Sequence, residues 1–231
     1  MRPLLFVAGT LGLSLLVGAG AYQSARVLRD VRLDFNLLLH PAQVFLQAAL
    51  VILCVGLGML SGLPARHLGW QAPAPLPDLA LGVAVGGLVP LILNSLTRMA
   101  AARWGHGIYS PAVIWAALPR RRSEWLWLPL ALIPTVLGEE LLFRSLWVGG
   151  IGYLTSPWLM AGLSAILFGA MHLPQGRLGV LGTGILGFGL AGLFIWRGSL
   201  LPAAVAHYLI NVAQLIHASR HREWIEHYPG H

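Results

Sequence analysis

Two adjacent glutamates, Glu139 and Glu140, lie in an apolar stretch of the chain together with one arginine, Arg144. An ionisable group at the centre of a lipid-spanning helix costs on the order of 2.5–3.5 kcal/mol, so such groups usually mark function and need partners. Glu140 and Arg144 are four residues apart, which makes them neighbours on one face of a helix. Glu139 is turned roughly 100° away, and the residue four positions after it is Phe143. We therefore expect Glu140 and Arg144 to neutralise each other and Glu139 to be available for chemistry.

Two later apolar stretches carry polar residues that could face Glu139. The first contains His172, four residues after Phe168, and the second contains His207 and Asn211. Because His207 and Asn211 are four residues apart, one helix face presents both. A single histidine near a helix end is more often a packing or interfacial residue, so these residues gain meaning only together. Other histidines fall in expected loops or near the chain end and are expected at the solvated surface: His67, His106, His217, His221, His227 and His231.

The expected depths of these residues in the membrane agree. At a rise of about 1.5 Å per residue, measured from one side of the membrane, Glu139 lies roughly 16 Å deep and His172 roughly 22 Å deep. On the same scale His207 lies roughly 10 Å deep and Asn211 roughly 16 Å deep. The sequence thus predicts that three separate helices bring the four residues to one site near the middle of the membrane.

The chemistry open to such a cluster is limited. No serine or cysteine lies beside a histidine in a nucleophile setting. A carboxylate, two imidazoles and an amide can hold and activate a water molecule: Glu139 as general base, the histidines orienting the water, and the Asn211 amide stabilising an oxyanion. Alternatively, Glu139, His172 and His207 form a His2Glu set like that of catalytic zinc hydrolases. The compact His-Glu-x-x-His signature is absent, so the spacing leaves zinc-dependent and metal-free water activation open.

The composition requires a membrane environment for these elements. The chain has 231 residues, of which 57% are hydrophobic and 10% are charged, and its mean hydropathy is +0.73. Soluble domains carry about 25% charged residues. We expect an all-α, polytopic transmembrane helical bundle of about seven to eight spans, forming a single integral membrane domain over residues 1–231. Apolar stretches long enough to cross a bilayer occur at residues 3–22, 41–62, 79–100, 124–148, 157–173, 177–196 and 200–218.

The arginines predict the orientation of the bundle. A short apolar piece at residues 108–118 is too short to cross, and is expected to be re-entrant, interfacial or part of an extra span. With seven crossings, most arginines collect on one side, including the cluster at residues 120–122, and only Arg2, Arg66 and Arg197 fall on the other. The positive-inside rule then places the N-terminus outside and the C-terminus in the cytoplasm, as in a bacterial inner membrane. The net charge of +7 is explained by these loop arginines, and no nucleic-acid partner is expected.

Three short motifs occur in separate apolar spans in a fixed order: Glu139-Glu140-x-x-x-Arg144, Phe168-x-x-x-His172 and His207-x-x-x-Asn211. They resemble the motifs of the CPBP family, which groups the type II CAAX prenyl endopeptidases with bacterial relatives linked to bacteriocin processing and self-immunity. The resemblance covers roughly residues 124–218, the expected catalytic core. It implies a helical intramembrane endopeptidase that is either glutamate-dependent or metal-dependent.

By position in these motifs, the resemblance implies that Glu139 is the catalytic glutamate. His172 and His207 complete the water-activating site, and Asn211 assists as an oxyanion donor. It also implies support from the other motif residues: Glu140, Arg144 and Phe168.

The expected reaction is hydrolysis of a peptide bond in a membrane-anchored or lipid-modified peptide, with the lipid bilayer as the surroundings. One alternative is a non-proteolytic membrane protein that protects against a bacteriocin by binding it or a partner. A small transporter or proton-relay subunit is a second alternative, because buried carboxylates and histidines also line ion paths. It is less favoured, since the chain has one membrane-buried carboxylate pair and no visible inverted repeat.

Overall fold

The computed structural model describes residues 1–31 and 33–226 of the chain, and in this part it contains helices and no strand. The predicted all-α helical bundle is therefore confirmed. The elements are α1 (Arg2–Asp30), η1 (Leu37–Leu39), α2 (Pro41–Ser61), α3 (Pro75–Trp104), η2 (His106–Ile108), α4 (Ala112–Ala117), α5 (Glu124–Glu140), η3 (Leu141–Ile151), α6 (Gly152–Leu154), α7 (Pro157–Met171), η4 (Leu173–Gln175), α8 (Gly176–Arg197), α9 (Leu201–Arg220) and α10 (Arg222–Glu226).

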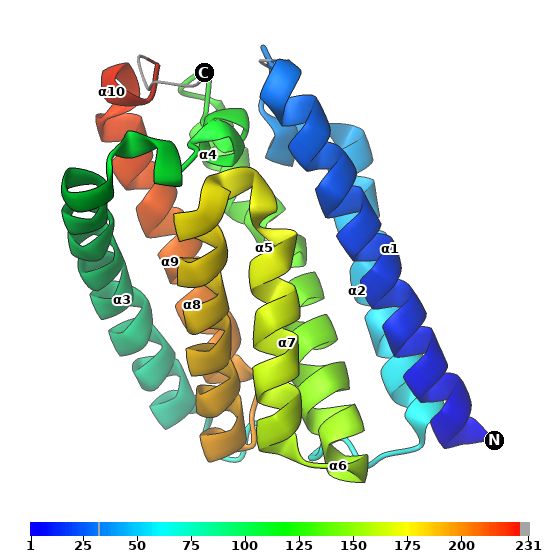
Figure 1. Cartoon of the computed structure of the whole chain (residues 1–231). Coiled ribbons are helices and arrows are strands. Elements are labelled where there is room, and N and C mark those ends of the chain that lie inside the picture. Colours follow the sequence, from blue (N-terminus) through cyan, green and yellow to red (C-terminus); the bar gives the residue numbers. More distant parts are fainter. Residues whose placement is uncertain (32, 227–231) are drawn as a thin grey trace.

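The long helices run up and down across the bundle, so that each returns towards the end from which the previous one came (Figure 1). α5, η3 and α6 follow one another without a break and act as one long element. α1 packs on α2, α3 on α9, and α7 on α8. The start of α1 and the short helix α10 lie at opposite ends of the bundle (Figure 1), as an odd number of crossings requires.

Each of the seven predicted spans corresponds to a long helix or continuous helical element, but not all are equally suited to lipid. Five helical segments are long and apolar enough to cross a membrane: Arg2–Leu28, Pro41–Ser61, Pro75–Trp104, Glu124–Leu154 and Leu173–Arg197. α7 is apolar but shorter. α9 is less apolar because it carries His207, Asn211, Gln214 and His217. The chain is an integral membrane protein whose shortest and most polar long helices are those that bring the histidines.

Residues 108–118 do not form a membrane crossing. They contain the end of η2, a short non-helical stretch and the six-residue helix α4, which is too short to span a bilayer. α4 lies at the end of the bundle where α10 also lies (Figure 1). The Asn36 amide donates to the carbonyl of Ala117, 2.9 Å away, and thereby ties this end to the connection before α2. The same end carries the arginine cluster at residues 120–122, so we call it the arginine-rich end.

Small residues allow the helices that carry the site to approach closely. The sequence predicts close packing at Gly82 and Gly86, and α3 there meets α9. A Cβ atom added at Gly82 would lie 2.7 Å from Cβ of Val205, and one added at Gly86 would lie 2.7 Å from Cβ of Leu209. α3 therefore presses against the α9 segment that contains His207, and any larger residue would push the two helices apart.

Candidate active site

Glu139 and Glu140 are the last two residues of α5, at the point where the hydrogen-bonding pattern of the helix changes. Beyond them η3 is a π-helix, in which each N–H bonds to the carbonyl five residues earlier. Such segments are rare and frequently occur at functional sites. The η3 side chains Leu142, Phe143 and Leu146 are at most 2% exposed. The two glutamates are therefore anchored by a buried helical segment directly after them.

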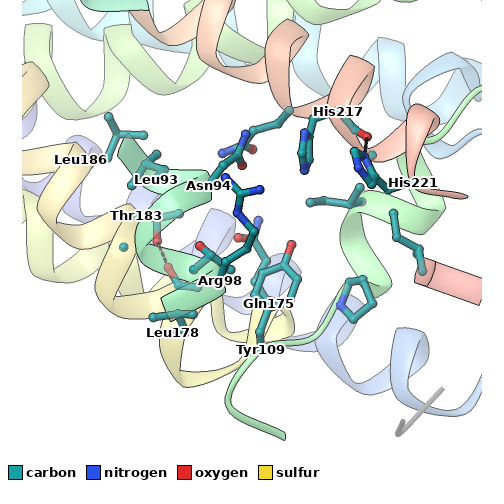
Figure 2. A pocket seen from close by; sticks show the side chains of 18 of the residues that line it. Leu93, Asn94, Arg98, Tyr109, Gln175, Leu178, Thr183, Leu186, His217 and His221 are labelled. Atoms are coloured by element: carbon teal, nitrogen blue, oxygen red, sulfur yellow. Dashed lines mark hydrogen bonds between the residues drawn. The ribbon is translucent and has the colours of Figure 1, made fainter. Parts of the chain in front are cut away.

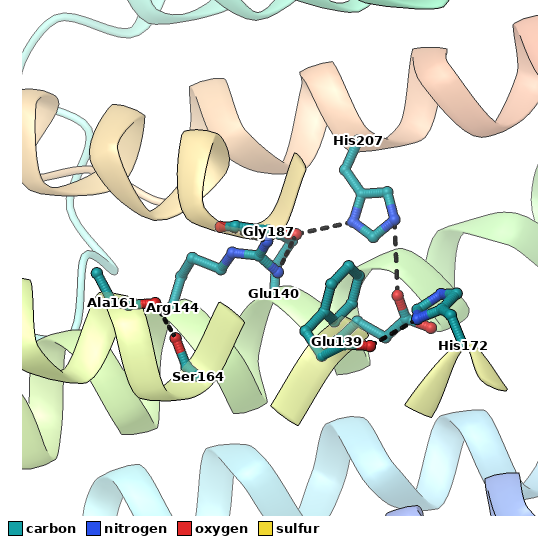
Figure 3. A network of polar contacts seen from close by, with 9 residues as sticks. Glu139, Glu140, Arg144, Ala161, Ser164, His172, Gly187 and His207 are labelled. Atoms are coloured by element: carbon teal, nitrogen blue, oxygen red, sulfur yellow. Dashed lines mark hydrogen bonds and ion pairs between the residues drawn. The ribbon is translucent and has the colours of Figure 1, made fainter. Parts of the chain in front are cut away.

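Glu140 is the centre of a buried polar network that joins α5, η3 and α9 (Figure 3). Its Oε1 atom lies 2.9 Å from Nη1 of Arg144 and 2.7 Å from Nδ1 of His207. Glu140 is fully buried, and Arg144 and His207 are 1% and 3% exposed. Arg144 also donates from Nη2 to the carbonyl of Gly187 on α8, 3.1 Å away. The expected pairing of Glu140 with Arg144 is present, and His207 is an additional partner that the sequence spacing did not predict.

This network determines which nitrogen of the neutral His207 ring carries the proton. A carboxylate accepts hydrogen bonds, so the Nδ1 atom that faces Glu140 carries the proton. In a neutral imidazole the other nitrogen, Nε2, then presents a lone pair. Next along α9, the Tyr208 hydroxyl donates to the carbonyl of Pro129 at 3.1 Å and holds α9 against α5. Both the ring orientation and the helix position of His207 are thus determined by contacts with α5.

Glu139 lies on the other side of the His207 ring from Glu140 (Figure 3). Its Oε2 atom is 3.6 Å from Nε2 of His207, and its side chain is 24% exposed. The separation is too long for a direct hydrogen bond, and a polar contact of this length is suited to a bridging water. Two consecutive glutamates thus flank one imidazole, one fully buried and ion-paired, the other partly exposed.

The Phe168 ring, on α7, connects the second histidine to this network. Its centroid is 4.7 Å from the His172 ring and 6.0 Å from the His207 ring, and the Arg144 guanidinium lies over it at 4.9 Å. His172 follows the last residue of α7, and its Nδ1 atom is 2.7 Å from the carbonyl of Phe168. Because a carbonyl only accepts, Nδ1 of His172 carries a proton and a neutral ring leaves Nε2 free.

Asn211 lies one turn beyond His207 on α9 and is half-buried. Within the described residues its side-chain amide makes no hydrogen bond, either to Glu139 or to another group. The structure therefore brings Glu139, Glu140, Arg144 and His207 into direct contact, and reaches His172 through Phe168. It leaves Asn211 near the site with an unused donor.

The expected zinc ligands only partly fit a metal. Both histidines have Nδ1 bonded to an oxygen acceptor and Nε2 available, which is the arrangement found in metal-binding histidines. However, across residues 1–31 and 33–226 no group of three His, Cys, Asp or Glu side chains is placed to hold a metal ion, and this includes Glu139, His172 and His207. In this arrangement the described residues therefore offer water activation by protein groups and not a complete set of metal ligands.

The comparisons with known proteins agree with the motifs. Residues 121–213 match the family described as type II CAAX prenyl endopeptidase Rce1-like, and this range contains Glu139, His172, His207 and Asn211. No curated protein and no solved structure gives a significant match to the chain. The match supports endopeptidase activity of the CAAX type in general. The Rce1-like match at residues 121–213 of this integral membrane protein thus supports a CPBP family intramembrane protease, as the resemblance predicts.

Proposed function

We propose that this protein is an intramembrane endopeptidase that hydrolyses a peptide bond in a membrane-anchored or lipid-modified peptide, with Glu139 as general base. The observation that carries this proposal is the contact of 3.6 Å between Glu139 Oε2 and His207 Nε2, on an imidazole whose other nitrogen is bonded to Glu140. This combination gives a carboxylate and a ring nitrogen close enough together for one water molecule beside them to bond to both.

The catalytic water lies beside Glu139 Oε2 and His207 Nε2 and bonds to both acceptors. It donates one hydrogen to the Glu139 carboxylate and the other to Nε2 of His207, so that an oxygen lone pair is free to attack a carbonyl carbon. Glu140 keeps the His207 proton on Nδ1, which preserves Nε2 as an acceptor. Positioning a water in this way and removing its proton contributes typically 10²–10⁴-fold to the rate.

The reaction then proceeds without any group besides the protein and water. As the water oxygen bonds to the scissile carbonyl carbon, its proton moves to Glu139 and the carbonyl oxygen becomes an oxyanion. The Asn211 amide, which has an unused N–H donor, stabilises this oxyanion. When the C–N bond breaks, Glu139 returns the proton to the leaving amine, so that the carboxylate is restored and the products are an acid and an amine. His172 packs against the Phe168 ring and is a further polar group of the site.

The first prediction tests the general base directly. In purified full-length protein, Glu139→Gln should lower kcat at least about 100-fold, because an amide keeps the size of the side chain but cannot take a proton. Cleavage is measured with a fluorogenic peptide that carries a farnesylated cysteine, in the presence and absence of a chelator. The matched control is Glu124→Gln, at the start of the same helix, which should keep wild-type turnover. If Glu139→Gln cleaves at the wild-type rate, Glu139 is not the general base. If the wild-type protein cleaves no lipidated peptide, the protein is a binding protein, and either result overturns the proposal.

A further inference from the structure

The arginine-rich end of the bundle, away from the glutamates, contains a cavity. A cavity of about 490 Å³ opens there between α3, α8 and α9, and the segment before α4 closes one side (Figure 2). None of the residues of the candidate active site lines it. Its lining includes Leu93, Arg98, Gly182, Leu186, His217 and His221.

The polar part of this cavity contains one cation and two imidazoles. Arg98 of α3 and His217 and His221 at the end of α9 point into the same space (Figure 2). Among the described residues, no aspartate or glutamate lines the cavity. In the part of the chain that the structure describes, Arg98 makes no ion pair or hydrogen bond. An arginine without an acidic partner in this space, beside imidazoles that can donate hydrogen bonds, favours an anionic ligand.

The apolar part of the cavity lies deeper in the membrane. Arg98 is six residues before the end of α3, roughly 9 Å below it, and Leu93 is roughly 16 Å below it. Leu186 on α8 lies roughly 15 Å below the start of that helix. The first turn of α8 also reaches the cavity through Leu178 and Gly179, and the positive end of its helix dipole adds to the attraction for an anion. The cavity is therefore amphiphilic, with its charged end towards the membrane surface and its apolar end towards the membrane interior.

We propose that this cavity binds an anionic phospholipid of the surrounding leaflet. The phosphate contacts Arg98, with His217 and His221 beside it, and one acyl chain lies against Leu93 and Leu186. The order of the groups with depth is that of a lipid in its own leaflet, and basic pockets between transmembrane helices bind anionic headgroups in this way. The site is distinct from the peptidase site, and the inference does not depend on whether the protein cleaves peptides.

The structure offers two matched pairs of variants to test this site. Arg98→Gln removes the anchoring charge, and Arg103→Gln removes a charge from the same helix outside the cavity lining. Gly182→Leu places a side chain at the cavity wall, where an added Cβ meets no atom within 4 Å. Gly189→Leu does the same on α8 outside the cavity lining, again with no atom within 4 Å. Because both glycine positions are sterically open, both leucine variants are expected to fold, which a thermal unfolding curve in detergent checks.

The probes are dioleoyl phosphatidylglycerol and dioleoyl phosphatidylcholine, which share their acyl chains and differ in headgroup charge. Native mass spectrometry of the full chain released from detergent counts the lipids retained. We expect phosphatidylglycerol to be retained about tenfold more strongly than phosphatidylcholine. Arg98→Gln should abolish this preference, and Gly182→Leu should reduce the binding of both lipids. Arg103→Gln and Gly189→Leu should behave as wild type.

Three results would overturn the proposal. The first is equal retention of the two lipids by the wild-type protein, and the second is an unchanged preference in Arg98→Gln. The third uses a decapeptide with a free carboxyl terminus and the same peptide with an amidated terminus. If only the free carboxylate peptide displaces phosphatidylglycerol and Arg98→Gln prevents this displacement, the cavity binds a peptide end and not a lipid.

Discussion

In the described part of the chain, two ion pairs join a buried carboxylate to a guanidinium, and only one of them belongs to a site for chemistry. Glu140 and Arg144 lie 2.9 Å apart in the interior, with side chains that are 0% and 1% exposed. Asp78 at the start of α3 and Arg197 at the end of α8 lie 2.7 Å apart, with side chains that are 1% and 27% exposed. The first pair lies within the continuous element formed by α5 and η3, and the second connects α3 with α8.

The difference between the pairs lies in what surrounds the carboxylate. Both carboxylates have one oxygen without a hydrogen-bond partner within the described residues, and Asp78 binds Arg197 alone. Glu140 binds Arg144 and also His207, and the far side of that histidine faces the partly exposed Glu139. A buried ion pair by itself is a structural connection. It becomes part of a reactive site when one member orients a titratable ring towards a second acid that has no cation of its own.

The largest expected difference between the two ion pairs is in the stability lost when the arginine is removed. Arg144→Met removes the cation from a fully buried carboxylate, which should lower the free energy of unfolding by about 3–5 kcal/mol. Arg197→Met should cost less, about 1.5–3 kcal/mol, because Arg197 is partly exposed and Asp78 lies in the first turn of α3, where the helix dipole stabilises a carboxylate. Unfolding in mixed micelles with increasing denaturing detergent measures both. Equal losses for the two variants would show that the interior pair has no special environment.

The next effect is on turnover. Glu140→Gln should lower kcat by about 10–100-fold, the usual loss when a group that orients a functional histidine is removed, because an amide no longer fixes the proton on Nδ1 of His207. Asp78→Asn makes the same chemical change in the other ion pair and should leave kcat near the wild-type value. Steady-state cleavage of the farnesylated reporter peptide provides the measurement. An inactive Asp78→Asn protein that remains folded would mean that the two pairs are coupled.

The smallest effect expected is that of the aromatic contact between the histidines. Phe168→Leu removes the ring that touches His172, His207 and the Arg144 guanidinium, and aromatic and cation–π contacts of this kind are worth about 0.5–2 kcal/mol each. We expect a several-fold fall in kcat and a modest loss of stability. Phe188→Leu, on the exposed face of α8, should change neither. Wild-type kcat in Phe168→Leu would show that His172 is held independently of this ring.

Much of the fold and part of the site can be predicted from the sequence because helical geometry is local. The step of roughly 100° per residue separates Glu139 from Glu140, and the structure gives the two side chains different exposure. Close approach at Gly82 and Gly86 follows from the absence of a side chain, and the contacts with α9 confirm it. The roles assigned to Glu139, His172, His207 and Asn211 stay predictions until variants are assayed.

Contacts between helices could not be predicted from spacing alone. The bond of His207 to Glu140 depends on how α9 is rotated against α5, and no local pattern reports that rotation. The carbonyl of Gly187 on α8 accepts from Arg144, and residue spacing does not predict this contact either. His221 is exposed, as expected, whereas His217 is half-buried, and both line the cavity beside α3. His227 and His231 lie outside the described residues. The fold of the bundle is thus encoded locally, and the pairing of its polar groups is encoded by the rotation of each helix.

The π-helical segment after Glu140 has a consequence for how this protein can change in length. A segment bonded to the fifth residue back holds one residue more than an α-helical turn would. Removing a single residue between 145 and 150 would let the segment return to ordinary helical bonding while the chain up to Arg144 keeps its register. We therefore expect natural or engineered variants to tolerate a one-residue deletion there and to lose folding from the same deletion between 130 and 140.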